Sequence, residues 1–156
     1  MTKLDAVLCG IAGEYFVAAE LSRRGYLASI TLRNSRGVDI LATNRDATKS
    51  VAIQVKTNQR GVAEWILNEK VEKSTGDDFL PENLFFVFVN LPPSGDAPSY
   101  HIIARREVAR LAKEGHERWL ATPGRGGRLH SNNPIRKFKD IEGKYRDRWD
   151  LLGLDS

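Results

Sequence analysis

Two alternating stretches in the first half of the chain constrain the fold more than any other feature. Residues 37–42 and 50–57 are rich in β-branched and other apolar residues that alternate with polar ones, which is typical of half-buried strands. The residues between them, 44–49, are polar and typical of a turn. The sequence therefore predicts a β-hairpin.

The polar side chains of this hairpin are expected to gather in one place. Side chains alternate between the two faces of a strand, so Gln54 and Lys56 share one face and the apolar residues of that strand share the other. If Ala42 pairs with Val51, Asp39 stands directly opposite Gln54, and Lys56 lies one diagonal step from Asp39, about 7 Å between side-chain bases. A carboxylate, an amide and an ammonium group then converge.

The length of 156 residues fits a single domain with a sizeable core. We expect this domain to span residues 1–156, with its core at about 6–104 and a basic helical extension at about 105–156. No run of about 18 apolar residues is present, so we expect a cytoplasmic protein without a membrane partner. The lone Cys9 excludes an internal disulfide, and no Cys or His spacing fits a zinc site.

Positive charge is concentrated in the later part of the chain. The net charge is +4; residues 1–100 carry 11 basic and 12 acidic side chains, whereas residues 101–150 carry 13 and 7. A polyanion such as nucleic acid would be attracted to the later part, because neutralising its phosphates releases counterions. The alternative is an ordinary solvated basic surface.

A first helix is predicted over residues 6–24, with Asp5 as its N-cap and Gly25 after its end. Glu14 lies among apolar residues of this helix at spacings of three, four and seven, so its carboxylate should point at or near the core. A charge in that position is costly unless it is paired or binds a metal ion. The apolar face is expected to consist of Leu8, Ile11, Ala12, Tyr15, Ala18, Ala19 and Leu21.

Further elements complete a mixed α/β (α+β) fold. The uninterrupted apolar run at 84–91 is expected to be a central strand, covered on both faces and parallel to the strand of Gln54. The remaining predictions are strands at 26–32, 65–67 and 100–103, helices at 68–74, 105–113, 117–122 and 143–152, and a flexible basic loop at 123–134.

Three aromatic residues of the later part allow two interpretations. Trp119, Tyr145 and Trp149 could each stack on a nucleic-acid base. Aromatic residues at helical spacing, however, more often belong to a core. We therefore favour core positions.

The polar cluster suggests metal-assisted chemistry on a phosphate. Because the first helix must cover one face of the hairpin, Glu14 is expected to join Asp39, Gln54 and Lys56. Mg²⁺ prefers oxygen ligands and keeps several waters, so the two carboxylates, the Gln54 amide oxygen and a main-chain carbonyl fit its needs. Such an ion would activate a bound water and neutralise charge on a phosphate oxygen. Lys56 would orient that water or stabilise the transition state.

Three short motifs follow one another in the predicted helix and hairpin: Gly13-Glu14-Tyr15, Gly37-Val38-Asp39-Ile40 and Ile53-Gln54-Val55-Lys56-Thr57. They resemble the PD-(D/E)XK nuclease superfamily, whose members include restriction enzymes and archaeal Holliday junction resolvases. The resemblance covers about residues 8–90. It implies a restriction-endonuclease-like αβββαβ core with a mixed central sheet, and magnesium-dependent hydrolysis of DNA phosphodiesters with Mn²⁺ as a substitute.

The resemblance assigns roles position by position. Asp39 matches the first acid of the motif, Lys56 its lysine, and Glu14 the helix glutamate of the resolvase branch. Val55 matches the residue whose carbonyl touches the metal. The chain departs from the pattern at Gln54, which replaces the second acid and is a weaker ligand than a carboxylate. It also departs at position 38, where valine replaces a proline that carries no chemistry.

Other residues are expected to contact nucleic acid. Ser35, Arg36, Thr57 and Arg60, with Asn58, flank the mouth of the expected pocket. One such site cuts one strand of DNA, so a homodimer is expected. Further basic residues of the later part are expected to grip the backbone without reading bases: Arg125, Arg128, Arg136, Lys137 and Lys139.

Three alternatives to a nuclease stay open. The first is a nucleic-acid-binding or protein-interaction module on the same fold, inactivated by the change at Gln54. The second is a buried ion network of Glu14, Asp39 and Lys56 that only stabilises the hairpin. The third is an unrelated α+β fold.

Overall fold

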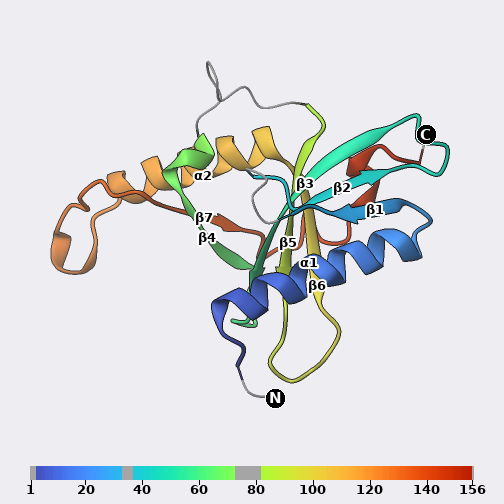
Figure 1. Ribbon diagram of the computed structural model, residues 1–156. Helices are drawn as coiled ribbons and strands as arrows, with labels where there is room; N and C mark the ends of the chain where they lie inside the picture. The colour runs from blue at the N-terminus through green and yellow to red at the C-terminus, as the bar shows by residue number, and fades with distance from the viewer. Residues whose placement is uncertain (1–2, 33–36, 73–81, 156) are drawn as a thin grey trace.

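The protein consists of a mixed β-sheet with a helix on each face and a second, small sheet beside it (Figure 1). The computed structural model describes residues 3–32, 37–72 and 82–155. Within these ranges no helix is long and apolar enough to cross a membrane. The elements are α1 (Ala6–Arg23), β1 (Leu27–Ile30), β2 (Ile40–Thr43), β3 (Ser50–Asn58), β4 (Glu64–Asn68), η1 (Glu69–Glu72), β5 (Leu84–Asn90), β6 (Ser99–Ala104), α2 (Arg105–Ala121), η3 (Arg125–Gly127), β7 (Ile135–Lys139) and η4 (Trp149–Leu152).

The main sheet has five strands in the order β1-β2-β3-β5-β6. β3 and β5 are parallel, and the other neighbouring pairs are antiparallel. Both the mixed α/β class and the parallel pairing of β5 with β3 are therefore confirmed. Five consecutive residues of β5, Phe85 to Val89, are buried, as expected for a central strand covered on both faces.

The predicted hairpin register is confirmed. Ala42 pairs with Val51 and Ile40 with Ile53 in the antiparallel β2–β3 ladder. Along β3 buried residues alternate with half-buried ones, so the strand presents an apolar face to α1 and the face of Gln54 and Lys56 to the other side. The alternation seen in the sequence thus corresponds to two different environments.

Helix α1 begins and ends as predicted, but it buries a different face. The Asp5 carboxylate accepts hydrogen bonds from the N–H groups of Val7 and Leu8, both 2.9 Å long, which caps the helix. Gly25 follows the helix with a φ of 89°, the left-handed conformation that glycine favours. The buried residues are Cys9, Gly13, Val17 and Leu21, whereas Leu8, Tyr15 and Ala19 of the expected face are exposed.

This difference has a steric cause. The small residues of α1 allow it to lie close to the sheet: a Cβ atom placed on Gly13 would lie 1.8 Å from the Oγ1 atom of Thr57 in β3. The helix therefore turns Gly13 toward β3, and the residues one and two turns away, Cys9, Val17 and Leu21, are buried with it. An apolar pattern assigns large residues to the core and cannot detect such close contact.

The second sheet contains a strand that the sequence analysis missed. β4, predicted as a short edge strand at 65–67, pairs antiparallel with β7 rather than with the main sheet. β7 falls within residues for which no element was expected. Its buried Arg136 and Phe138 alternate with exposed residues. Over so short and basic a segment, this alternation does not distinguish a strand from a loop in the sequence. The predicted helix at 68–74 is a 3-10 turn, η1, and its last two positions lie outside the described residues.

One continuous helix, α2, replaces the two helices predicted at 105–113 and 117–122. Arg110 bridges Glu107 and Glu114 at spacings of three and four along this helix. Gly115 is exposed at the predicted break, and a glycine in a helix costs only about 1 kcal/mol relative to alanine. Such side-chain pairs and the packing of the helix against the sheet are sufficient to continue it.

The predicted helix at 143–152 is wrong. Gly143 and Asp147 have positive φ values of 73° and 54°, which interrupt any helix. The N–H group of Tyr145 donates to the buried Asp140 carboxylate (2.9 Å), whose other contact is the His101 imidazole (2.6 Å). This segment is therefore held by side-chain hydrogen bonds, and only Trp149–Leu152 forms a 3-10 turn.

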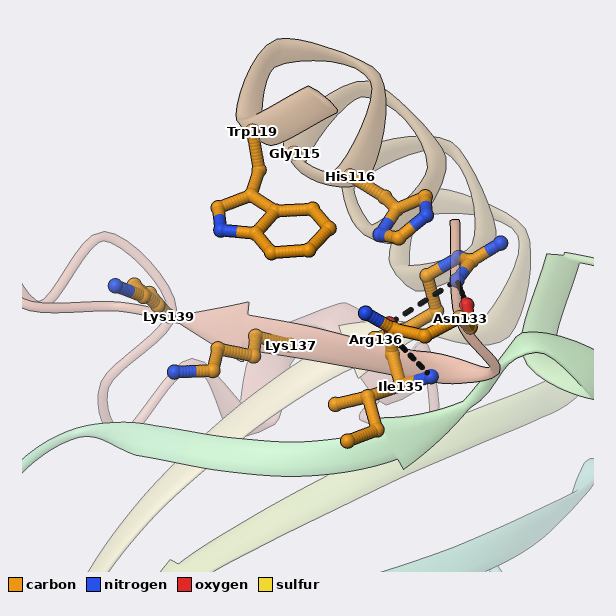
Figure 2. Close-up of a pocket in the computed structure, with 8 residues that line it drawn as sticks. All are labelled: Gly115, His116, Trp119, Asn133, Ile135, Arg136, Lys137 and Lys139. Carbon is orange, nitrogen blue, oxygen red and sulfur yellow. Dashed lines mark hydrogen bonds between the residues drawn. The ribbon is translucent and has the colours of Figure 1, made fainter. Parts of the chain in front are cut away.

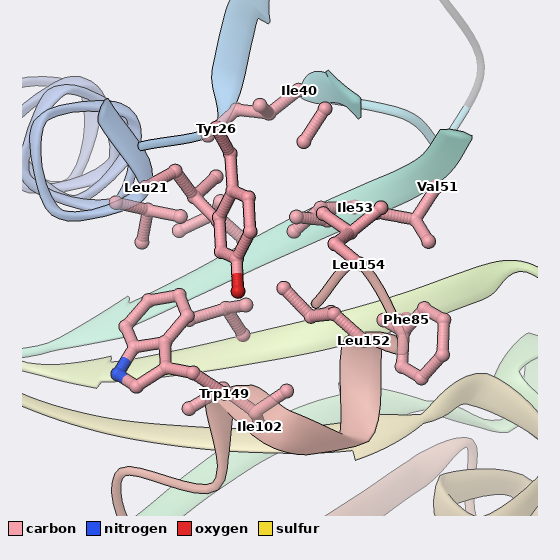
Figure 3. Packing of buried hydrophobic residues seen from close by; sticks show 14 of the residues in the cluster. Leu21, Tyr26, Ile40, Val51, Ile53, Phe85, Ile102, Trp149, Leu152 and Leu154 are labelled. Carbon is pink, nitrogen blue, oxygen red and sulfur yellow. The ribbon is translucent and has the colours of Figure 1, made fainter. Parts of the chain in front are cut away.

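Two clusters of buried residues lie on opposite faces of the main sheet. The cluster on the α1 side includes Leu21, Ile53 and Ile102, and it is completed by Trp149 and Leu152 from the end of the described chain (Figure 3). The cluster on the α2 side joins that helix to both sheets through Trp65, Phe86, Phe88, Val108 and Phe138. Tyr145 and Trp149 are thus core residues, as expected, although they belong to different clusters.

The stability of the protein should fall in alkaline solution as the phenol of Tyr26 ionises. Burial and the hydrogen bond from Tyr26 Oη to the Asp155 carboxylate raise the pKa of Tyr26 from 10.0 to about 12. The stabilisation is complete below the unfolded pKa and is lost as the pH rises to the folded one. Between about pH 9 and about pH 11 the wild type should lose about 1 kcal/mol of unfolding free energy relative to Tyr26→Phe. Urea titrations at each pH measure this, and equal losses in both proteins would contradict it.

Candidate active site

Asp39 lies where strands β2 and β3 separate. Its N–H group donates to the Ile53 carbonyl (2.8 Å), while its Oδ2 atom accepts a hydrogen bond from the Val55 N–H group (2.7 Å). The carboxylate therefore replaces β2 as the partner of β3 beyond the last ladder pair, Ile40 with Ile53. Because these two bonds bracket position 54, Asp39 is level with Gln54, as the register predicts.

Glu14 approaches Asp39 from helix α1. The two half-buried acids line one cavity of about 300 Å³, together with Gly10, Thr31 and Val38. Thr31 fixes the strand that precedes Asp39, because its Oγ1 donates to the Val38 carbonyl (2.6 Å). The glutamate of the first helix and the aspartate of the hairpin thus line the same cavity.

Gln54 and Lys56 lie on the face of β3 that is opposite α1. In the parallel register they stand beside Phe86 and Phe88, which belong to the core on the α2 side. Both side chains are half-buried. Lys56 lines a second cavity, of about 410 Å³, with Arg60 and the start of α1 at Ala6. Since Ala6 also lines the cavity of Glu14 and Asp39, the two cavities are neighbours.

The contact between Gly13 and Thr57 sets the position of Glu14. Among the described residues, the buried Thr57 Oγ1 has no hydrogen-bond partner, because the backbone of α1 lies against it. Glu14 follows Gly13 directly, so the same close approach holds its backbone near β3. Thr57, expected to hold a phosphate, is instead a contact between helix and strand.

Two polar residues that follow the motif hold the rim of the site. The Asn58 amide donates to the carbonyls of Val62 (3.1 Å) and Glu64 (2.9 Å), which fixes the turn into β4. The Gln59 side chain bonds both the N–H and the carbonyl of Leu4, at 3.0 Å each, and so ties the segment before α1 to the end of β3. The sequence gives no sign of this role for Gln59 beyond an amide next to the motif.

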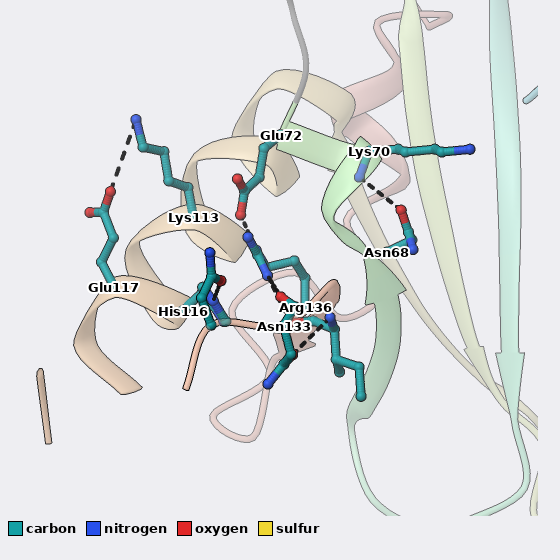
Figure 4. A network of polar contacts seen from close by, with 10 residues as sticks. Asn68, Lys70, Glu72, Lys113, His116, Glu117, Asn133 and Arg136 are labelled. Atoms are coloured by element: carbon teal, nitrogen blue, oxygen red, sulfur yellow. Dashed lines mark hydrogen bonds and ion pairs between the residues drawn. The ribbon is translucent and has the colours of Figure 1, made fainter. Parts of the chain in front are cut away.

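The other predicted residues are distributed as follows. Arg60 is exposed at the second cavity. Arg125 and Arg128 are exposed on the loop that projects beyond the end of α2, away from α1 and β2 (Figure 1). Arg136 is buried and bonded to Glu72 (Figure 4), so its charge is compensated within the protein. The predicted positions Ser35 and Arg36 lie outside the described residues.

Comparison with known proteins bears on this arrangement. No protein-family model matches the chain, and no curated protein sequence matches it. Among solved structures, the bacterial homing endonuclease I-Ssp6803I superposes with a TM-score of 0.53 and 12% identity, over 96% of this chain and 92% of that one. The two proteins share a fold. The likeness extends through the C-terminal third, to which the sequence motifs do not apply.

The donor set of the first cavity fits a magnesium ion that keeps several waters. Mg²⁺ is usually bound by one or two carboxylates together with substrate phosphates. Glu14 and Asp39 supply two carboxylates, and Asp39 keeps its second oxygen for a metal while the first accepts from Val55. Within residues 3–32, 37–72 and 82–155, no group of three or more His, Cys, Asp and Glu side chains could hold a metal ion. A metal here would therefore depend on water and phosphate oxygens for its other ligands.

Proposed function

We propose that this protein is a divalent-metal-dependent endonuclease that hydrolyses phosphodiester bonds of DNA. The observation that carries the proposal is the cavity that Glu14 and Asp39 share where β2 and β3 separate. The Asp39 carboxylate accepts a hydrogen bond from Val55 of β3, and Lys56 is the next residue of that strand. The fold that the chain shares with a homing endonuclease supports it. The net charge of +4 favours a polyanionic substrate.

Each residue of the site has a role in this reaction. Glu14 and Asp39 would hold Mg²⁺, with the Val55 carbonyl as a further ligand, and Mn²⁺ would substitute; Gln54, expected as a ligand, does not line their cavity. The bound ion would activate a water and offset charge on the scissile phosphate. Lys56 would stabilise the negative charge that develops on the phosphate oxygens. Arg60 at the second cavity would contact a neighbouring phosphate.

Cutting both strands of a duplex would require two such sites. A single cavity of about 300 Å³ serves one phosphate at a time. A homodimer would place one site on each strand, which is the arrangement we propose for a double-strand break.

The second candidate function is DNA binding without cleavage. A specific observation favours it: two acids, Glu14 and Asp39, line the cavity, and position 54 carries a neutral amide that does not line it. A neutral ligand binds a metal more weakly than a carboxylate does. The same surface would then hold DNA through its basic residues alone.

Incubation with linear, nicked, branched and single-stranded DNA in Mg²⁺ or Mn²⁺ tests the proposal. At least one substrate should be cut, and chelation of the metal by EDTA should stop the reaction, because the water and phosphate both depend on the ion. Gel electrophoresis of labelled strands measures this. Salt-sensitive binding of the same DNA without cleavage under any condition would establish the binding module instead.

A further inference from the structure

A further cavity, which we call the Trp119 pocket, lies apart from Glu14 and Asp39, between the end of α2 and the outer face of β7 (Figure 2). It encloses about 350 Å³, within the range of small-molecule sites. Trp119 and His116 reach it from the helix, and Ile135, Lys137 and Lys139 reach it from the strand. It therefore combines an aromatic wall with basic side chains.

Trp119 is held in place but is accessible. Its exposed fraction is 39%, whereas those of Trp65 and Trp149 are 2% each. The indole stacks on His130 with centroids 4.0 Å apart and an angle of 16°, and it lies 5.4 Å from His116. The sequence favoured a core position for this residue, which the exposure contradicts. A flat, oriented and partly exposed indole is well suited to stack on another ring at low entropic cost.

The basic side chains of the pocket keep a positive balance. Lys137 and Lys139 each bond the Glu64 carboxylate at 2.9 Å, and these two hydrogen bonds hold the pKa of Glu64 below its usual value. Two ammonium groups share one carboxylate, so this trio has a net charge of +1. Both lysines stay about half exposed, which leaves them accessible to an anion.

The pocket is connected to the candidate active site. Glu64, which bonds both lysines, also lines the cavity of Lys56 and Arg60. From that ion pair, β7 continues for four residues to Ile135, about 13 Å at the usual rise of a strand. This length corresponds to a few nucleotides of an extended strand.

We propose that the Trp119 pocket binds an unpaired base of the nucleic acid that occupies the candidate active site. The base stacks on Trp119, and Lys137 and Lys139 contact the adjoining phosphates. This inference rests on the proposed function and adds a substrate class, since bases within a duplex are stacked on each other and must leave the helix to reach Trp119. The preferred substrate is DNA with a single-stranded or splayed segment beside the cut.

Tryptophan fluorescence tests the inference directly. Because Trp119 is the exposed one of the three tryptophans, stacking should quench its emission when oligothymidylate is added in EDTA, where cleavage does not interfere. Trp119→Leu should abolish this quenching and weaken binding of a labelled oligothymidylate about tenfold by anisotropy. Trp119→Phe, which keeps a ring, should bind within about threefold of wild type.

Three controls separate base stacking from other causes. Tyr15→Leu removes an exposed aromatic residue of α1 and should change nothing. An abasic oligonucleotide with the same number of phosphates should bind wild type about tenfold more weakly and be insensitive to Trp119→Leu. Circular dichroism melting should show that the Trp119 variants remain folded.

The opposite results would overturn the inference. These are equal affinity for the abasic oligonucleotide, equal quenching by polyglutamate, which would indicate an acidic protein partner, or no binding of single strands. If oligothymidylate quenches the tryptophan emission but no DNA is cut, the base-binding pocket is supported and the proposed nuclease activity is refuted. Cleavage without quenching would refute the pocket alone.

Discussion

Replacement of Lys56 by alanine should reduce DNA cleavage by about 10²-fold or more, the usual cost of removing a group that stabilises transition-state charge. Lys56 lies one residue beyond Val55, whose N–H group holds the Asp39 carboxylate in place. Its side chain is half-buried on the face of β3 opposite α1, so its loss leaves the buried cluster on the α1 side unchanged. Single-turnover cleavage of the best substrate measures the effect.

Lys49→Ala is the matched control, because it removes an exposed lysine just before the same strand. It should cut at the wild-type rate. Circular dichroism melting should show that both variants remain folded. If Lys56→Ala cuts as fast as wild type, catalysis at this site is wrong.

Replacement of Gly13 by alanine should have the largest effect on stability, a loss of about 2 kcal/mol. The new Cβ atom would lie 1.8 Å from Thr57 Oγ1, and 3.0 and 3.1 Å from Thr57 Cβ and Cγ2. Rotation of the threonine would move Oγ1 but not its own Cβ, which would remain in a tight contact at 3.0 Å. The helix must move away from β3, and urea unfolding measures the cost.

Gly10→Ala provides the control within the same helix. Among the described residues no atom lies within 4 Å of a Cβ at this position, so the alanine should stabilise the protein by up to about 1 kcal/mol through helix propensity alone. In the Gly13→Ala background, Thr57→Ala should recover part of the loss, because it removes the nearest atom. A neutral effect of Gly13→Ala would show that the helix is not held at this contact.

The hairpin and the central strand could be predicted from the sequence because their signals are local. Alternation along β3 fixes which residues face each side, and one register places Asp39 opposite Gln54. The Asp5 cap and Gly25 likewise mark the ends of α1 through their own backbone requirements. These features depend on residues that are neighbours in the sequence or in a hairpin.

The remaining features depend on partners that the sequence does not specify. The buried face of α1 is decided by the fit of Gly13 against Thr57, and β7 exists because β4 pairs with it. Tyr145 and Trp149 have helical spacing, yet the bond from Tyr145 to Asp140 draws the chain into an irregular path. Tertiary contacts override local preference in each case.

The sequence motifs also identified which acids belong to the candidate site, but they did not predict how its side chains are arranged. Glu14 and Asp39 do share a cavity, whereas Gln54 does not line it and Lys56 lines the neighbouring one. The alternation of the strands predicts that Asp39 and Gln54 share a face, but it does not predict which cavity each side chain lines.

Completion of the α1-side core by Trp149, Leu152 and Leu154 has a consequence for biosynthesis. These residues pack with Val17, Leu21 and other residues near the start of the chain, so this core cannot close until residues 149–154 have left the ribosome. The emerging chain must therefore leave part of this apolar core uncovered until those residues have emerged, and chaperones that bind nascent apolar segments would meet it there.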